Sequence, residues 1–99
     1  MVAEIRWSKN ATRDYRNVVD YLLEEWNEDI ALRFIELLEH KIEGIAKHPS
    51  TGLRSQNDPD IRSISITKHN RLYYKITKDW LEIVNIFDTR QHPDKNLYR

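Results

Sequence analysis

The spacing of apolar residues changes along the chain, and each spacing predicts one kind of element. Residues 3–7 alternate apolar and charged side chains, which is typical of a half-buried strand. Apolar residues then recur every three or four positions, first from Ala11 to Trp26 and again from Ala31 to Ile45. This spacing places each set on one face of a helix. The pattern therefore predicts a strand followed by two amphipathic helices.

The ends of both helices carry residues that favour starts and stops. Ser8 stands just before the first helix, where its hydroxyl can accept a hydrogen bond from a free backbone N–H. Asn27 interrupts the pattern between the helices, and Pro49 ends the second because the residue before a proline avoids the helical conformation. Since only a few residues join them, the two helices should fold back as an antiparallel hairpin.

The second half of the chain has the character of a sheet. Residues 49–52 are turn formers, and residues 54–60 are polar and predicted to be a loop. Three β-rich runs follow, at residues 61–66, 71–77 and 80–87, with gaps short enough for hairpins. The last run is apolar on both faces and is therefore predicted to lie centrally, with Ile83 and Phe87 on one face and Val84 and Ile86 on the other.

These elements predict a single α+β domain over residues 1–99, with the order β-α-α-β-β-β. A helical hairpin should pack on one face of a mostly antiparallel sheet, because neither helix can bury its apolar stripe alone. In the middle run, alternation places Tyr74 with Leu72 and Ile76 toward the core, and Arg71 with Tyr73 on the opposite face. That opposite face is expected to be partly open, and residues 89–99 are expected to form a polar tail.

Composition narrows the class of protein. There is no cysteine, which excludes a disulfide framework and a thiolate metal site. No apolar run approaches the roughly 20 residues that span a bilayer, and the first residues lack the apolar core of a signal peptide. We therefore expect a cytoplasmic protein that does not enter the membrane. No spacing of His with carboxylates predicts a metal ion, and no cofactor is implied.

Charge is divided unevenly although the net charge is zero. Residues 1–60 hold 8 Lys or Arg and 12 Asp or Glu, whereas residues 61–99 hold 8 and 4. A basic half can mark a surface for nucleic acid or for an acidic partner, and it can equally be an ordinary solvated face.

Several motifs occur in the order and spacing of a known toxin family. They are Trp7-Ser8 with Ala11, Val19-Asp20-Tyr21-Leu22, Ala31-Leu32-Arg33-Phe34, Ile45-Ala46-Lys47-His48-Pro49-Ser50-Thr51-Gly52, Ile61-Arg62-Ser63-Ile64, Arg71-Leu72-Tyr73-Tyr74-Lys75-Ile76, and the stretch from Ile83-Val84-Asn85-Ile86-Phe87 through Asp88-Thr89-Arg90-Gln91-His92-Pro93. Together they resemble the RelE/ParE superfamily of bacterial type II toxin–antitoxin systems over nearly the whole chain.

The resemblance implies a compact toxin that a cognate antitoxin binds and silences. ParE-like members poison DNA gyrase without nuclease chemistry, and RelE-like members cut mRNA, usually on the ribosome. The long helical hairpin and the Asp-Thr-Arg-Gln-x-Pro ending look more like ParE. The alternatives are an RelE-like mRNA endonuclease and a degenerate module that only binds its antitoxin.

Cleavage of RNA through the 2′-hydroxyl needs cations on the phosphate and groups that move protons. Arg62, Arg71 and Arg90 are the candidate cations, and they or His92 are the candidate catalytic residues. Asp88 stands roughly where the nuclease branch tends to carry a basic residue or histidine, which counts against cleavage.

Each candidate also has a structural interpretation. Arg62 can pair with Asp60 or Asp88, Arg90 can pair with Asp88, Arg71 can be solvated, and His92 can be a surface histidine.

Two surfaces are candidates for contact with other molecules. Tyr73, on the face with Arg71, is the better placed tyrosine for stacking on a target, since Tyr74 is predicted to be core. For the antitoxin, the candidate groove lies on the helical hairpin around Val19, Leu23 and Leu37, where a partner helix or strand would fill it. These three residues can equally complete the core of the hairpin.

Overall fold

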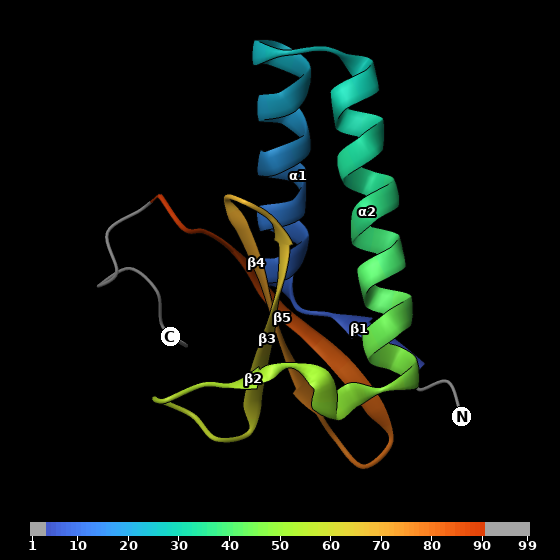
Figure 1. Ribbon diagram of the computed structural model, residues 1–99, viewed down its shortest axis with the longest axis vertical. Coiled ribbons are helices and arrows are strands. Elements are labelled where there is room, and N and C mark those ends of the chain that lie inside the picture. Colours follow the sequence, from blue (N-terminus) through green and yellow to red (C-terminus); the bar gives the residue numbers. More distant parts are fainter. Residues whose placement is uncertain (1–3, 91–99) are drawn as a thin grey trace.

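The computed structural model describes residues 4–90, and it confirms an α+β fold in which two helices pack on a sheet (Figure 1). The elements are β1 (Glu4–Trp7), α1 (Lys9–Glu25), α2 (Glu28–Lys47), the short 3₁₀ helix η1 (Pro49–Thr51), β2 (Leu53–Arg54), β3 (Ile61–Thr67), β4 (Asn70–Ile76) and β5 (Trp80–Asp88). The helices lie side by side and antiparallel, and the turn between them stands beyond the strands. Within these residues, no helix is long and apolar enough to cross a bilayer.

The first helix begins at the N-cap that the sequence predicts, and Asn27, predicted only to interrupt the pattern, also caps the second. The Ser8 hydroxyl oxygen accepts a hydrogen bond from the backbone N–H of Ala11 at 2.9 Å. Asn27 does the same for α2, where its side-chain oxygen accepts from the N–H of Ile30 at 3.0 Å. Each cap satisfies a backbone donor that has no partner in the helix. Asn27 therefore both ends the hairpin turn and starts the second helix.

The sheet has five strands in the order β1-β5-β4-β3-β2. β5 is internal, as predicted, and pairs in parallel with β1 and antiparallel with β4. β2 is an additional edge strand at the start of the predicted loop, and it pairs antiparallel with β3. A two-residue strand is too short to show alternation, so the sequence pattern contains no signal for it.

A core between the helices and the sheet holds the two layers together. Its buried members are Ala11, Phe34, Leu38, Ile45, Ile66, Leu72, Tyr74, Leu81, Ile83 and Ile86. Tyr74 has an exposed fraction of 0%, so its predicted place in the core is confirmed.

A β-bulge changes the predicted faces of β5. Tyr73 lies opposite Asn85 but Tyr74 lies opposite Ile83, which leaves Val84 as an extra residue. An extra residue reverses the alternation beyond it. Ile83 and Ile86 therefore share the helix-facing core, while Val84 and Phe87 belong to a cluster on the other face. The prediction that placed Ile83 with Phe87 is wrong for this reason.

The face of the sheet away from the helices is less open than expected. Tyr73 is 3% exposed and lies in a buried cluster with Ile61, Val84 and Phe87. The expectation that Tyr73 would stack on a target is therefore wrong, because the ring is buried among apolar side chains on this face, including Phe87, which the bulge turns here in place of Ile86.

Helix α1 completes the edge of β5 where β1 ends. The last β1–β5 pair is Trp7 with Ile83. Beyond it, Ser8 donates from its backbone N–H to Ile83 O at 3.0 Å and from its hydroxyl to Val84 O at 2.6 Å. The N–H of Ile86 then donates to the Asp14 carboxylate at 3.0 Å. The N-cap residue Ser8 and the α1 side chain of Asp14 thus satisfy β5 backbone groups that a longer β1 would have bonded.

Candidate functional site

A groove runs between the helical hairpin and the ends of β3, β4 and β5. It has a volume of about 610 Å³. One wall is apolar, and its residues come from both helices and from β5: Val18, Leu22, Trp26, Ile30, Phe34, Leu37 and Ile86. The other end is polar and is formed by Thr67, His69, Asn70, Asp88 and Arg90, with Asp14, Asn17 and Arg33 along the helices. An apolar cleft with a few convergent polar groups is the usual character of a binding site.

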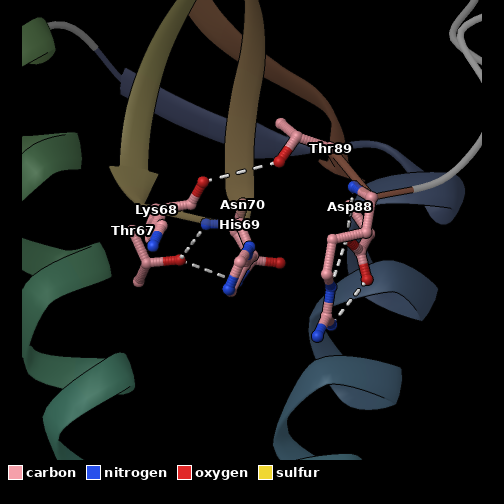
Figure 2. Close-up of polar contacts among 7 residues, drawn as sticks. Thr67, Lys68, His69, Asn70, Asp88 and Thr89 are labelled. Atoms are coloured by element: carbon pink, nitrogen blue, oxygen red, sulfur yellow. Dashed lines mark hydrogen bonds and ion pairs between the residues drawn. The ribbon is translucent and has the colours of Figure 1, made fainter.

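The polar end of the groove is built on the β3–β4 turn. The two strands meet at the pair Thr67 and Asn70, so Lys68 and His69 form the turn itself. The Thr67 hydroxyl oxygen accepts hydrogen bonds from the His69 N–H at 3.2 Å and from the Asn70 side-chain amide at 2.9 Å. Figure 2 shows these residues facing Asp88 and Thr89 at the end of β5. The N–H of Thr89 donates to His69 O at 2.9 Å, which holds the turn against β5.

Asp88 and Arg90 form an ion pair at this end of the groove, as the sequence predicts. Arg90 Nη2 lies 2.9 Å from Asp88 Oδ2, and Arg90 Nε lies 3.1 Å from Oδ1. Two parallel N–H bonds to one carboxylate are the strong geometry for this pair. The hydrogen bond from Arg90 is the main cause that lowers the pKa of Asp88, and the charge of His69 adds to it. The Arg90 guanidinium also lies 6.0 Å from the ring of Tyr21 on α1.

We expect Arg90→Ala to raise the pKa of Asp88 toward its ordinary value of 3.8. A carboxyl with a lowered pKa stabilises the fold above that ordinary value, and the contribution is lost as pH falls through the lowered pKa. The substitution should therefore remove stability at neutral pH and little at strongly acidic pH. Carboxyl NMR titration measures this directly. Arg6→Ala, which breaks the exposed pair with Glu4, is the control and should leave Asp88 unchanged; an equal shift in both variants would contradict the assignment.

Arg62 has partners that the sequence did not predict. Its Nη1 donates to the backbone carbonyls of Gly52 at 2.9 Å and of Ser50 at 3.3 Å. The expected pairing with Asp60 or Asp88 is wrong, because the pairing of β2 with β3 brings the segment just before β2, which carries these carbonyls, alongside Arg62. Arg62 lies opposite Tyr74 on the core-facing side of the sheet.

The Tyr74 hydroxyl fixes the same segment from inside. It donates to Pro49 O at 2.6 Å and accepts from the Gly52 N–H at 3.0 Å. Burial raises the pKa of Tyr74, so the hydroxyl keeps its proton and donates it. Arg62 and Tyr74 together hold the chain after α2 against the sheet.

Arg71 lies on the other side of the sheet from the groove. Its Nε donates to the hydroxyl oxygen of Ser63 at 2.8 Å, and its side chain is half-buried. The three arginines therefore do not converge: Arg90 lines the groove, Arg62 lies at the far end of β3, and Arg71 points to the opposite face. His92 lies outside the described residues.

The candidate antitoxin residues divide between groove, core and surface. Leu37 lines the groove. Val19 and Leu37 also pack against the core, so the core interpretation applies to both in part. Leu23 is 46% exposed. Tyr21 and Trp26 are groove residues that sequence reasoning missed; both are large apolar side chains left 45% and 64% exposed, but exposure cannot be seen in a helical repeat.

A sequence model of the family described as "ParE toxin of type II toxin-antitoxin system, parDE" matches residues 5–93. The chain belongs to the ParE toxin family. It is thus a type II toxin–antitoxin toxin of the ParE/RelE superfamily, as the motifs indicated. Among curated proteins, no sequence matches it.

Solved structures share the fold of this ParE family chain at low sequence identity. The chromosomal ParDE system from P. aeruginosa matches with a TM-score of 0.73 and 12% identity, covering 88% of this chain and 96% of that one. The YoeB/ParE toxin from Agrobacterium tumefaciens gives 0.64 and 17%, covering 86% and 96%. The E. coli DinJ-YafQ toxin–antitoxin complex gives 0.63 and 12%, covering 91% and 96%. At these identities the likeness establishes the fold alone.

Proposed function

We propose that this toxin inhibits growth by binding a cytoplasmic target such as DNA gyrase, rather than by cutting RNA. One observation carries the proposal: the three candidate arginines lie apart, and each is held by a partner inside the protein. Arg62 binds backbone carbonyls, Arg71 binds Ser63, and Arg90 binds Asp88. Membership of the ParE family supports the same assignment.

The separation matters because phosphoryl transfer needs its cations on one phosphate. Donors stabilise a transition state only when they are aimed at the same developing charge. Arg62 and the groove end of β3 at Thr67 are five residues apart, which is roughly 16 Å along a strand. Arg90, the one arginine of the three in the groove, shares that site with the carboxylate of Asp88, which repels phosphate.

The groove is the surface that we propose for the antitoxin. Its apolar wall suits the apolar face of a helix or strand, and its polar end would fix the orientation of that segment. Leu37 lies in the wall and Leu23 stands exposed on the same hairpin. DinJ-YafQ is described as a toxin–antitoxin complex, which supports a protein partner for this fold.

The test is inducible expression of the toxin with and without its antitoxin, followed by RNA sequencing and a supercoiling assay with purified gyrase. We expect growth arrest, loss of gyrase supercoiling and intact mRNA, all reversed by the antitoxin. Cut mRNA that disappears in Arg62→Ala or Arg90→Ala would instead establish the RelE-like endonuclease. No arrest with a folded protein would establish a module that only binds its antitoxin.

Within the groove, Leu37→Glu is expected to weaken antitoxin binding by about tenfold or more, because a buried charge without a partner is costly. Leu53→Glu, at an exposed leucine on the edge strand β2, is the matched control for added charge. Isothermal titration with purified antitoxin measures the affinity of both variants, and equal affinities would show that the antitoxin does not bind in the groove.

A further inference from the structure

The outward face of α1 carries two blocks of opposite charge. Lys9, Arg13 and Arg16 form the first block, and Asp20 and Glu24 form the second. All five are exposed. Their spacing of three and four residues places them on one stripe of the helix, opposite the face that holds Ala11, Val18 and Leu22 against the core.

Among the described residues, no ion pair within the chain engages these five charges. The ion pairs within residues 4–90 join Arg6 to Glu4 and Arg90 to Asp88, and neither involves the stripe. Arg13 donates a hydrogen bond to a neutral acceptor, the side-chain oxygen of Asn10, at 3.1 Å.

The order of the blocks also opposes the helix dipole. Negative charge is favourable at the start of a helix and positive charge at its end. Helix α2 follows this rule, with Glu28 and Asp29 in its first turn and Lys47 in its last. Helix α1 has no acidic residue in its first turn and no basic residue in its last. A pattern that costs local stability in one helix and not in its neighbour indicates a role outside the helix.

We infer that the stripe binds a second copy of this chain, with the two α1 helices antiparallel. Arg16 then lies opposite Asp20 of the second copy, and Arg13 lies opposite Glu24, because both pairs are centred on the same turn of the helix near Val18. A two-fold axis through that turn makes every contact occur twice. Lys9 lies beside the C-terminal end of α1 of the second copy, where the helix dipole is negative.

The same alignment provides an apolar anchor. Leu23 is 46% exposed, and the symmetry places Leu23 of the second copy opposite Arg13. A hollow of about 460 Å³ lies there, lined by residues that include Trp7, Thr12, Arg13 and Arg16. A leucine in this hollow shields the ion pairs from water. Exposed ion pairs alone contribute little, so the anchor is needed for a specific contact.

The dimer leaves the antitoxin groove open. On α1 the groove is lined by Val18 and Leu22, opposite the stripe, and it extends to Asn17, which also lines the hollow beside the stripe. The residues that line most of the groove therefore stay outside the shared surface, and the dimer is compatible with an occupied groove. This inference goes beyond the proposed function, since it concerns the purified protein without its target.

The test is sedimentation velocity of the full-length protein over a range of concentrations, at low and at high salt. We expect a monomer–dimer equilibrium that weakens as salt is added. Arg13→Glu and Glu24→Arg should each raise the dimer dissociation constant by about tenfold, because each turns two attractive contacts into repulsive ones. The double variant Arg13→Glu with Glu24→Arg should restore the wild-type constant, since it exchanges the partners of a symmetric pair. Lys78→Glu is the matched charge control, and circular dichroism checks that each variant is folded.

Three results would overturn the inference. The first is a wild-type protein that stays monomeric at every concentration at low salt. The second is a dimer that the single variants do not weaken or that the double variant does not restore. The third is a monomer that binds a nucleic acid strand through Arg13, seen as a salt-dependent affinity that both Arg13→Glu and the double variant lose.

Discussion

Gly52→Ala is expected to destabilise the protein by about 2–3 kcal/mol. A methyl group at this position would lie 2.9 Å from both Cε1 and Cζ of Tyr74, and closer still to its hydroxyl oxygen. Tyr74 cannot move away easily, because it is fully buried and its hydroxyl is bonded to Pro49 and to Gly52 itself. Gly52 has a φ of −69°, which any residue adopts. The position therefore requires glycine for space and not for backbone conformation.

Urea unfolding measures this effect, and the chain offers a matched control. Gly44 lies within α2, and a methyl group there would meet nothing within 4 Å. Gly44→Ala should therefore stabilise the protein by about 0.5–1 kcal/mol, as alanine does inside a helix. If the two variants unfold at the same denaturant concentration, the close packing of Gly52 on Tyr74 does not hold the segment after α2.

Asp14→Ala is expected to cost about 2 kcal/mol, because it leaves the N–H of Ile86 without its acceptor. Ile86 is 5% exposed, so water does not readily replace the lost bond. Asp14→Asn keeps a side-chain oxygen at the same place and should retain most of the stability near neutral pH. Equal losses in both variants would show that the hydrogen bond to β5 contributes little.

The pH dependence of the Asp14 variants follows from the direction of one pKa. Burial raises the pKa of Asp14 above its ordinary value of 3.8, although the bond from Ile86 and the charge of Arg13 act against it. A carboxyl with a raised pKa contributes stability below its ordinary value, and the contribution is lost as pH rises through the raised one. As pH rises over that interval, the free energy of unfolding of Asp14→Asn should therefore increase relative to that of the wild type, as unfolding at a series of pH values would show. Asp79→Asn, in an exposed turn, is the control and should not gain.

Local signals predicted both helices and the cap that starts the first. The three- and four-residue spacing placed both apolar stripes, and the capping side chains of Ser8 and Asn27 act within three residues of themselves. The face of each residue beyond Val84 could not be predicted, because the bulge arises from how β4 and β5 pair. Alternation is a pattern within a single strand, whereas a bulge is an extra residue in one strand relative to the strand that pairs with it.

Contacts in the candidate site could be predicted where the two interacting residues are close in sequence. Asp88 and Arg90 are two residues apart, and their ion pair followed from the sequence. The partners of Arg62 are backbone carbonyls ten and twelve residues away, which carry no side-chain signal. The role of Asp14 could have been inferred from its position, since it lies four residues before Val18 and therefore on the buried side of α1. A carboxylate at such a position needs a donor, and the nearest one belongs to a strand 72 residues further on.

The position of β5 in the sheet determines when the protein can complete its fold during synthesis. Of the strands in residues 4–90, β1 is the first and β5 the last, yet they lie next to each other, and the hydrogen bond from Ser8 to Val84 spans 76 residues. Contacts between residues so distant in sequence require a long loop to close, and the loss of chain entropy comes before the contacts stabilise the fold. This slows folding. Until β5 is synthesised, the helical hairpin has no strand beside β1 to cover, and Asp14 has no N–H to bind. A chain that ends before residue 80 therefore lacks the β5 residues of the groove, and the toxin reaches its folded state only after β5 has been synthesised.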